Sequence, residues 1–286
     1  MSEERRTQRV SRSDGPAKAT NAPSKSEGLR AYAFAYLAFL YLPVLFLPLF
    51  SFNASHFIAF PLAGFTLEWY RQLFADDAML HALGNSLEVG AVTALLATLL
   101  GLTAAKAVTQ YRLRGVGAML GFISLPLFIP DIVLGLSLLL LLGVAGFPLS
   151  LAGVVLGHLT LCVPFALTVM IARFEGFDRN LEEASADLGE TAWITFWRVT
   201  FPLMLPGIAA SLLLTFITSF DEFLLAYFLS GTEATLPVYI WGQLRFPERL
   251  PMVLALGALI LVVSVALVIL AEWARNRGVE KKSIGA

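Results

Sequence analysis

The chain contains six apolar runs of roughly 20 residues, and these runs constrain its fold more than any other feature. A helix rises about 1.5 Å per residue, so roughly 20 residues cross the ~30 Å hydrocarbon core of a bilayer. Backbone polar groups find no water in hydrocarbon and must bond within their own segment, so each run is predicted to be a transmembrane helix. We place the runs at Ala31–Phe50, Ser86–Val108, Gly117–Leu142, Leu151–Ile171, Gly207–Phe228 and Met252–Glu272.

The composition excludes a soluble globular protein. Hydrophobic residues make up 57% of the chain and charged residues 14%, against about 45–50% and about 25% in soluble domains. The single cysteine, Cys162, lies inside an apolar run, which excludes a disulfide framework and a cysteine-based metal site. The predicted fold class is therefore an all-α membrane protein with six transmembrane helices, and neither a metal nor a cofactor is expected.

Basic residues are concentrated on one side of the predicted membrane. Seventeen flank the runs on the side of the two termini and three lie on the other side, so the positive-inside rule places both termini in the cytoplasm. The seventeen are Arg5, Arg6, Arg9, Arg12, Lys18, Lys25, Arg30, Lys106, Arg112, Arg114, Arg173, Arg179, Arg198, Arg275, Arg277, Lys281 and Lys282, and the three are Arg71, Arg245 and Arg249.

Four segments follow from this map. Residues 1–28 are expected to be a disordered basic cytoplasmic tail, because they are rich in Ser, Pro and basic residues and have no apolar period. Residues 29–79 hold the first transmembrane helix and an external loop, and 80–273 hold the transmembrane domain. Residues 274–286 form a cytoplasmic C-terminal tail.

A charged loop separates the fourth and fifth apolar runs. Asp178 or Asn180 can cap a short helix that runs through Leu188, and Gly189 supplies a left-handed stop. Thr191 can start a second helix that ends near Thr200, which predicts a helix-turn-helix. An amphipathic loop resting on the bilayer is the alternative, but it explains neither the glycine break nor the flanking prolines. The residues that define the segment are Glu183, Ala184, Ser185, Asp187, Leu188, Gly189, Pro202 and Pro206.

This segment resembles the cytoplasmic EAA loop of ABC importer permeases of the MetI-like kind, over roughly Leu80 to Trp273. Within that family the chain is most similar to the second permease subunit of polyamine (spermidine/putrescine) importers. Ser185 stands where the motif usually has Ala, and Glu190 replaces a common Ala. The stretches that carry the narrower resemblance are residues 50–53, 111–115, 130–133, His158 with 162–165, and 219–222.

The resemblance implies a non-enzymatic subunit of the bacterial inner membrane. Its expected partners are a second permease subunit, two cytoplasmic ATPase subunits, an extracytoplasmic substrate-binding protein and the lipid bilayer, with no nucleic acid. The chain has no Gly-x-x-x-x-Gly-Lys-Ser/Thr loop, so ATP must be hydrolysed by another chain. Alternatives are an importer of an opine, an amino acid or a metal chelate, a proton-coupled secondary transporter, and an ion channel.

Acidic residues inside the apolar runs are the candidates for a translocation pathway. Asp131 and Asp221 each lie fourteen residues from the cytoplasmic start of their run, so straight helices place both at a similar depth, roughly 21 Å up. Glu222 follows Asp221, and His158 falls near the same layer. Carboxylates at one depth would suit a cation, because its arrival relieves their mutual repulsion.

Each of these residues also has a structural explanation. Asp131 could cap a helix broken by Pro126 and Pro130, whereas Asp221 and Glu222 could pair with arginines of a sister subunit. A histidine alone on an apolar helix is often a hydrogen-bonded packing residue.

Overall fold

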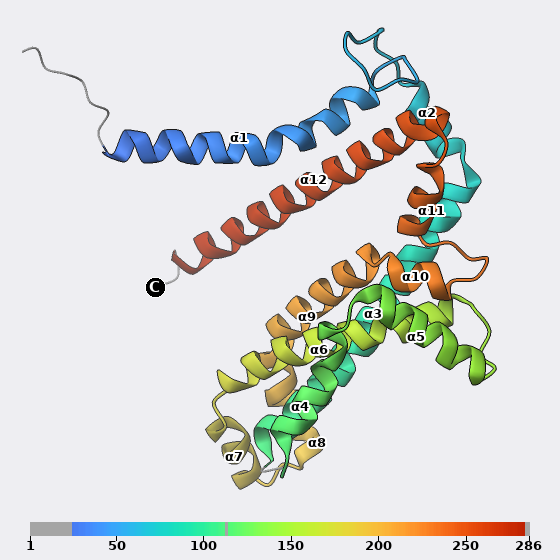
Figure 1. The fold of residues 1–286 in the computed structure, drawn as a ribbon. Coiled ribbons are helices and arrows are strands. Elements are labelled where there is room, and N and C mark those ends of the chain that lie inside the picture. The colour runs from blue at the N-terminus through green and yellow to red at the C-terminus, as the bar shows by residue number, and fades with distance from the viewer. Residues whose placement is uncertain (1–24, 112–113, 284–286) are drawn as a thin grey trace, which may run out of the picture.

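The computed structural model describes residues 25–111 and 114–283, and within them helices joined by loops are the regular structure, apart from one isolated β-bridge between Asn53 and Phe65 (Figure 1). Most of the predicted N-terminal tail, residues 1–24, lies outside the described residues. The helices are α1 (Lys25–Ser51), α2 (Glu68–Ala75), α3 (Asp77–Gln110), α4 (Val116–Ser124), η1 (Leu125–Phe128), α5 (Asp131–Val144), α6 (Leu151–Glu175), α7 (Asn180–Asp187), α8 (Ala192–Thr195), η2 (Phe196–Thr200), α9 (Phe201–Asp221), α10 (Leu224–Leu229), α11 (Leu236–Gln243), η3 (Pro247–Arg249) and α12 (Leu250–Ser283).

Among the described residues, five helical segments are long and apolar enough to cross a membrane, and a bent pair of helices makes a sixth span. The all-α class and the count of six predicted from sequence are therefore confirmed. The last helix, α12, continues to Ser283, past its predicted end at Glu272.

The third predicted span, Gly117–Leu142, is wrong as a straight helix. α4 and η1 meet α5 at an angle of 104°. Pro126 lies in the 3-10 turn and Pro130 precedes the first residue of α5. Neither proline has a backbone N–H to donate, so the helix ends and restarts in a new direction. The depth of Asp131 estimated from a straight helix does not hold.

The fifth predicted span, Gly207–Phe228, starts and ends too late. One continuous helical segment runs from Ala192 to Asp221 and includes a π-helical turn at Phe196–Thr200. The predicted second helix of the charged loop is thus the beginning of this span. The helix then breaks at Glu222 and Phe223, and a separate short helix, α10, follows.

The centre of the fold is the packing of α3 against α6 and α9 (Figure 1). A Cβ atom added to Gly101 of α3 would lie only 2.8 Å from backbone and side-chain carbon atoms of Ala166 in α6, so the two helices touch through their backbones. Figure 1 shows α1 and α12 lying side by side, splayed away from this centre. The α7–α8 connection lies at one end of the bundle, and α2 and α11 lie at the other (Figure 1).

Candidate functional site

The charged loop folds as a short helix, a glycine stop and a second helix. The Asp178 carboxylate accepts a hydrogen bond from the Asn180 backbone N–H at 3.0 Å, where α7 begins. Gly189 has φ of +88° just after α7 ends, which confirms the predicted left-handed stop. Thr191 accepts from the Ile194 N–H at the start of α8. The predicted helix-turn-helix is therefore present, and we call residues 178–200 the loop motif.

The residue that anchors the loop motif is Glu182, which the sequence analysis did not select. Its carboxylate accepts from Lys106 Nζ at 3.3 Å and from Gln110 Nε2 at 2.6 Å, both on α3. It also accepts from the Thr200 hydroxyl in the π-helical turn. Glu182 thus ties α7 to α3 and to the start of α9. The side chains of Lys106 and Glu182 are 27% and 20% exposed, so the pair is only partly solvated.

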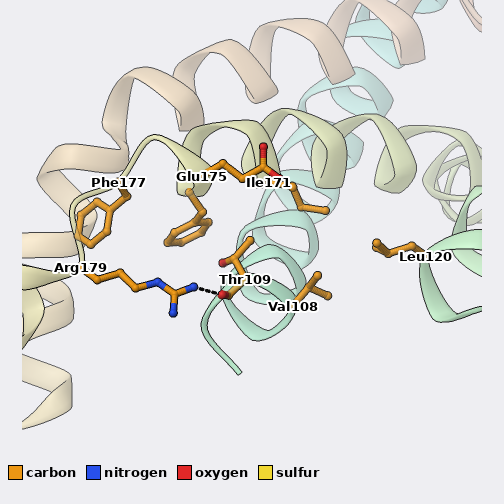
Figure 2. Close-up of a pocket in the computed structure, with 8 residues that line it drawn as sticks. Val108, Thr109, Leu120, Ile171, Glu175, Phe177 and Arg179 are labelled. Atoms are coloured by element: carbon orange, nitrogen blue, oxygen red, sulfur yellow. Dashed lines mark hydrogen bonds between the residues drawn. The ribbon is translucent and has the colours of Figure 1, made fainter. Parts of the chain in front are cut away.

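Three further contacts brace the same motif. Figure 2 shows the Arg179 side chain reaching across an open cavity of about 340 Å³ to donate to the Thr109 carbonyl at the end of α3. Ser185 and Thr195 share a hydroxyl–hydroxyl hydrogen bond of 2.9 Å between α7 and α8. Arg198 pairs with Glu190 at 2.9 Å. The inner side of the loop motif is thereby held by polar contacts.

The outer side of the loop motif presents apolar and acidic side chains to its surroundings. Leu188 is 86% exposed and Trp193 is 69% exposed. Glu183, Ala184 and Asp187 are also exposed, and among the described residues no hydrogen bond or ion pair involves the Glu183 side chain. Pro202 and Pro206 lie on exposed positions of α9. The motif residues predicted from sequence thus largely face outward, and Ser185 alone among them bonds across the motif.

The predicted acidic residues lie at helix ends near the break between α9 and α10. Asp221 is the last residue of α9, and Asp131 is the first residue of α5. Glu222 lies in the break itself, between α9 and α10. Gly135 of α5 faces Leu224 and Phe228 of α10, which holds the two short helices together. The bent third span therefore packs its outer half, which begins at Asp131, against the short helix that follows Asp221 and Glu222.

The three carboxylates have different local partners. Glu222 accepts a hydrogen bond from the Leu225 N–H at 3.0 Å, which caps the first turn of α10. Asp131 lies in the first turn of α5, where the helix dipole favours a negative charge, although its side chain makes no capping hydrogen bond. The predicted proline break is present, whereas the predicted cap by Asp131 is not.

His158 lies in the packed centre of the bundle. Its ring is 1% exposed, and Nδ1 is 2.7 Å from the Ser219 hydroxyl of α9. This geometry favours the packing explanation, and its place in a pathway stays a prediction.

Comparison with known proteins gives the family. Residues 97–277 match the model of the binding-protein-dependent transport system inner membrane component. The chain belongs to this family. It is therefore a multi-pass membrane permease.

Relatives at the level of whole chains agree with this identification. The chain is 34% identical to the spermidine/putrescine transport system permease protein PotC of Escherichia coli K12 over 223 residues, 78% of this permease and 84% of the relative. It is 37% identical to the putrescine transport system permease protein PotI of the same strain over 243 residues, 82% and 85% of the two chains. A solved bacterial ABC transporter for import of the acidic polysaccharide alginate contains a chain with a TM-score of 0.64, 19% identity and coverage of 88% and 98%, which shows a shared fold.

Replacing Gly189 tests the geometry of the loop motif. Gly189→Val places a β-branched side chain at a positive φ and should cost about 1–2 kcal/mol of local stability. We expect the assembled transporter to insert normally but to lose most of its uptake. Gly189→Asn is the control, because Asn tolerates this backbone region, and it should retain most uptake. Wild-type uptake by Gly189→Val would contradict the expectation.

Replacing Glu182 tests the anchor. Glu182→Ala leaves two donors on α3 and one in η2 without their acceptor, and we expect about 1–3 kcal/mol of local destabilisation. Hydrogen–deuterium exchange of α7 in the purified permease should accelerate. Glu183→Ala removes a neighbouring carboxylate without these contacts and should leave exchange unchanged. Equal exchange in the two variants would show that the contacts of Glu182 contribute nothing.

Proposed function

We propose that this permease forms one half of the translocation pathway of an ATP-driven importer for polyamines. Three carboxylates lie at the end of α9, in the α9–α10 break and at the start of α5, which packs against α10, and this placement is the main support for the substrate class. Carboxylates at membrane depth cost free energy and are usually retained where they face a pathway or a paired charge. A multiply charged ammonium ion supplies the compensating charge. The relatives whose names specify spermidine and putrescine support the same class.

The loop motif is proposed to dock on a cytoplasmic ATPase subunit. Its inner side is held by Glu182 and Arg179, whereas its outer side exposes Leu188, Trp193 and Glu183. An exposed apolar surface with a rigid support suits contact with another protein. The same helical segment continues to Asp221, so a displacement at the loop motif moves the acidic residue.

The complete importer would contain a second permease subunit, two ATPase subunits and an extracytoplasmic substrate-binding protein. The orientation is the one that the basic residues indicate, with both termini and the loop motif in the cytoplasm. The α2–α11 end then faces the substrate-binding protein. Ser185 and Glu190, the departures from the usual motif, are held internally by Thr195 and Arg198 and leave the outer side of α7 available.

Neutralising the acids tests the substrate class. Asp131→Asn and Asp221→Asn keep the shape of the side chain and remove an attraction of roughly 1–4 kcal/mol per charge at close range. Uptake should fall in both variants while assembly and basal ATP hydrolysis persist, and spermidine uptake should fall more than putrescine uptake. The measurement is uptake of both substrates normalised to assembled complex. An unchanged ratio of the spermidine and putrescine uptake rates would show that the two carboxylates do not distinguish substrates by their charge.

Cysteine labelling tests the orientation. Cysteine at Ala234, in the turn before α11, should react with a membrane-impermeant thiol reagent in intact cells. Cysteine at Ser283, the last residue of α12, should react only after the membrane is opened. Labelling of Ser283→Cys from outside would place the loop motif on the wrong side for a cytoplasmic ATPase.

A further inference from the structure

A groove of about 250 Å³ lies beside the acidic residues, between the end of α9, α11 and α12. Asp221 is the single charged residue among those that line it in the described part of the chain. The other lining residues are apolar or aromatic: Phe220, Phe223, Leu236, Pro237, Ile240, Trp241, Leu244 and Ile260. The volume is below the range of roughly 300–1,000 Å³ typical of drug-sized ligands, so the groove suits a small molecule or one end of a longer one.

Of the three carboxylates, Asp221 has the fewest nearby groups that offset its negative charge. It ends a helical segment of 30 residues, and the dipole of a helix places partial negative charge at that end. Within the described residues its side chain has neither a hydrogen-bond donor nor a basic partner, and it is exposed. Glu222 and Asp131 both lie at helix starts, where the dipole has the opposite sign. The charge at Asp221 is therefore the one that most favours an incoming cation.

Two packed aromatic rings line the same groove as this carboxylate. The centroids of Phe223 and Trp241 are 5.4 Å apart, with their planes at 48°. Trp241 is 47% exposed, so its ring is accessible. Aromatic faces attract ammonium groups and also pack against methylene chains. A carboxylate beside two such rings matches an alkyl chain with a cationic end better than it matches a hydrated metal ion or an anion.

Hydrogen bonds to α3 and to its N-cap residue hold in place the helix that carries Trp241. The Asn85 side chain donates to the Ala234 carbonyl at 2.9 Å, and the Leu236 N–H donates to the Ser86 hydroxyl at 2.8 Å. The Tyr239 hydroxyl donates to the Asp76 carboxylate at 3.0 Å. Burial and the Asp76 carboxylate raise the pKa of Tyr239, so the hydroxyl keeps its proton and this contact persists. These bonds fix α11 to α3.

We propose that this groove binds one end of an alkyl diammonium ion, with the ammonium group at Asp221 and the methylene chain against Phe223 and Trp241. The proposal rests on the proposed function for the substrate class and adds the aromatic residues that recognise the chain between the charges. The second ammonium group is then left for Glu222, in the α9–α10 break, or for Asp131, at the start of α5, which packs against α10.

Putrescine uptake by the fully assembled transporter tests the groove. Trp241→Leu keeps an apolar side chain and removes the aromatic face, and we expect uptake to fall about three- to tenfold. Trp241→Phe should restore most of it. The matched control is Phe246→Leu, because Phe246 is an exposed aromatic residue in the same region that does not line the groove, and its uptake should be unchanged.

The outcomes separate the groove from the proposed function. Unchanged uptake in Trp241→Leu together with reduced uptake in Asp221→Asn would overturn the groove and leave the polyamine pathway standing. Loss of assembled complex in Trp241→Leu would show that the groove is a contact with the sister permease, which also overturns the proposal. If the unaltered transporter takes up no polyamine, the proposed function fails. A labelling experiment then tests separately whether the groove binds a cation.

The labelling experiment uses Trp241→Cys in the assembled transporter, with Phe246→Cys as its control. A cationic methanethiosulfonate reagent should react at position 241 at least about threefold faster, relative to an anionic one, than at position 246. Asp221→Asn should abolish this preference, and putrescine should slow the reaction at position 241 alone. Equal preference at the two positions, or its persistence in Asp221→Asn, would overturn the assignment of the groove to a cation.

Discussion

The close approach of α3 and α6 is the contact on which the rest of the structure depends. Gly101 leaves no side chain between the helices, and Ala97, Cys162 and Ala166 form a buried cluster at the same crossing. Small residues at a crossing let backbones approach, and within a bilayer this packing replaces the hydrophobic effect as the force between helices. Thr98 then meets Ser211 of α9 at 3.0 Å, and His158 of α6 meets Ser219 of α9 at 2.7 Å. These polar contacts position α9 against α3 and α6. They are buried, so water does not compete for the same donors and acceptors.

This arrangement makes α9 the link between the two ends of the molecule. Its helical segment starts in the loop motif at Ala192 and ends at Asp221, a length of about 45 Å at 1.5 Å per residue. Glu182 contacts both Thr200 at its lower end and Lys106 on α3. The π-helical turn lies beside this contact, and such turns are frequent at functional sites. A displacement of α7 is thus delivered to the start of a continuous helix.

The sequence predicted the number of spans, the glycine stop and the residues of the loop motif, because length, hydropathy and backbone freedom are local properties. The sequence left open whether the third span breaks at Pro126 and Pro130, because many transmembrane helices tolerate prolines. The helix break after Asp221 contains no proline or glycine, so the sequence did not predict it. The packing of α10 against α5 accounts for the break. Glu182 and Glu183 are adjacent and chemically identical, so only their positions relative to α3 distinguish the anchor from the exposed acid.

The two walls of the groove belong to different parts of this framework. Asp221 moves with α9, whereas Trp241 lies on α11, which hydrogen-bonds to α3 through Asn85 and Ser86. Any shift of α9 along α3 therefore changes the distance between the carboxylate and the aromatic ring. A ligand that contacts both walls binds best at one separation, and a conformational change that alters the separation must alter its affinity. The contact between Thr98 and Ser211 joins α9 to α3, and the contact between His158 and Ser219 joins α9 to α6, so such a shift would alter both. Three of these four side chains are Ser or Thr hydroxyls, which can donate to a new acceptor after a small displacement, so the contacts that hold α9 in register would not prevent a shift.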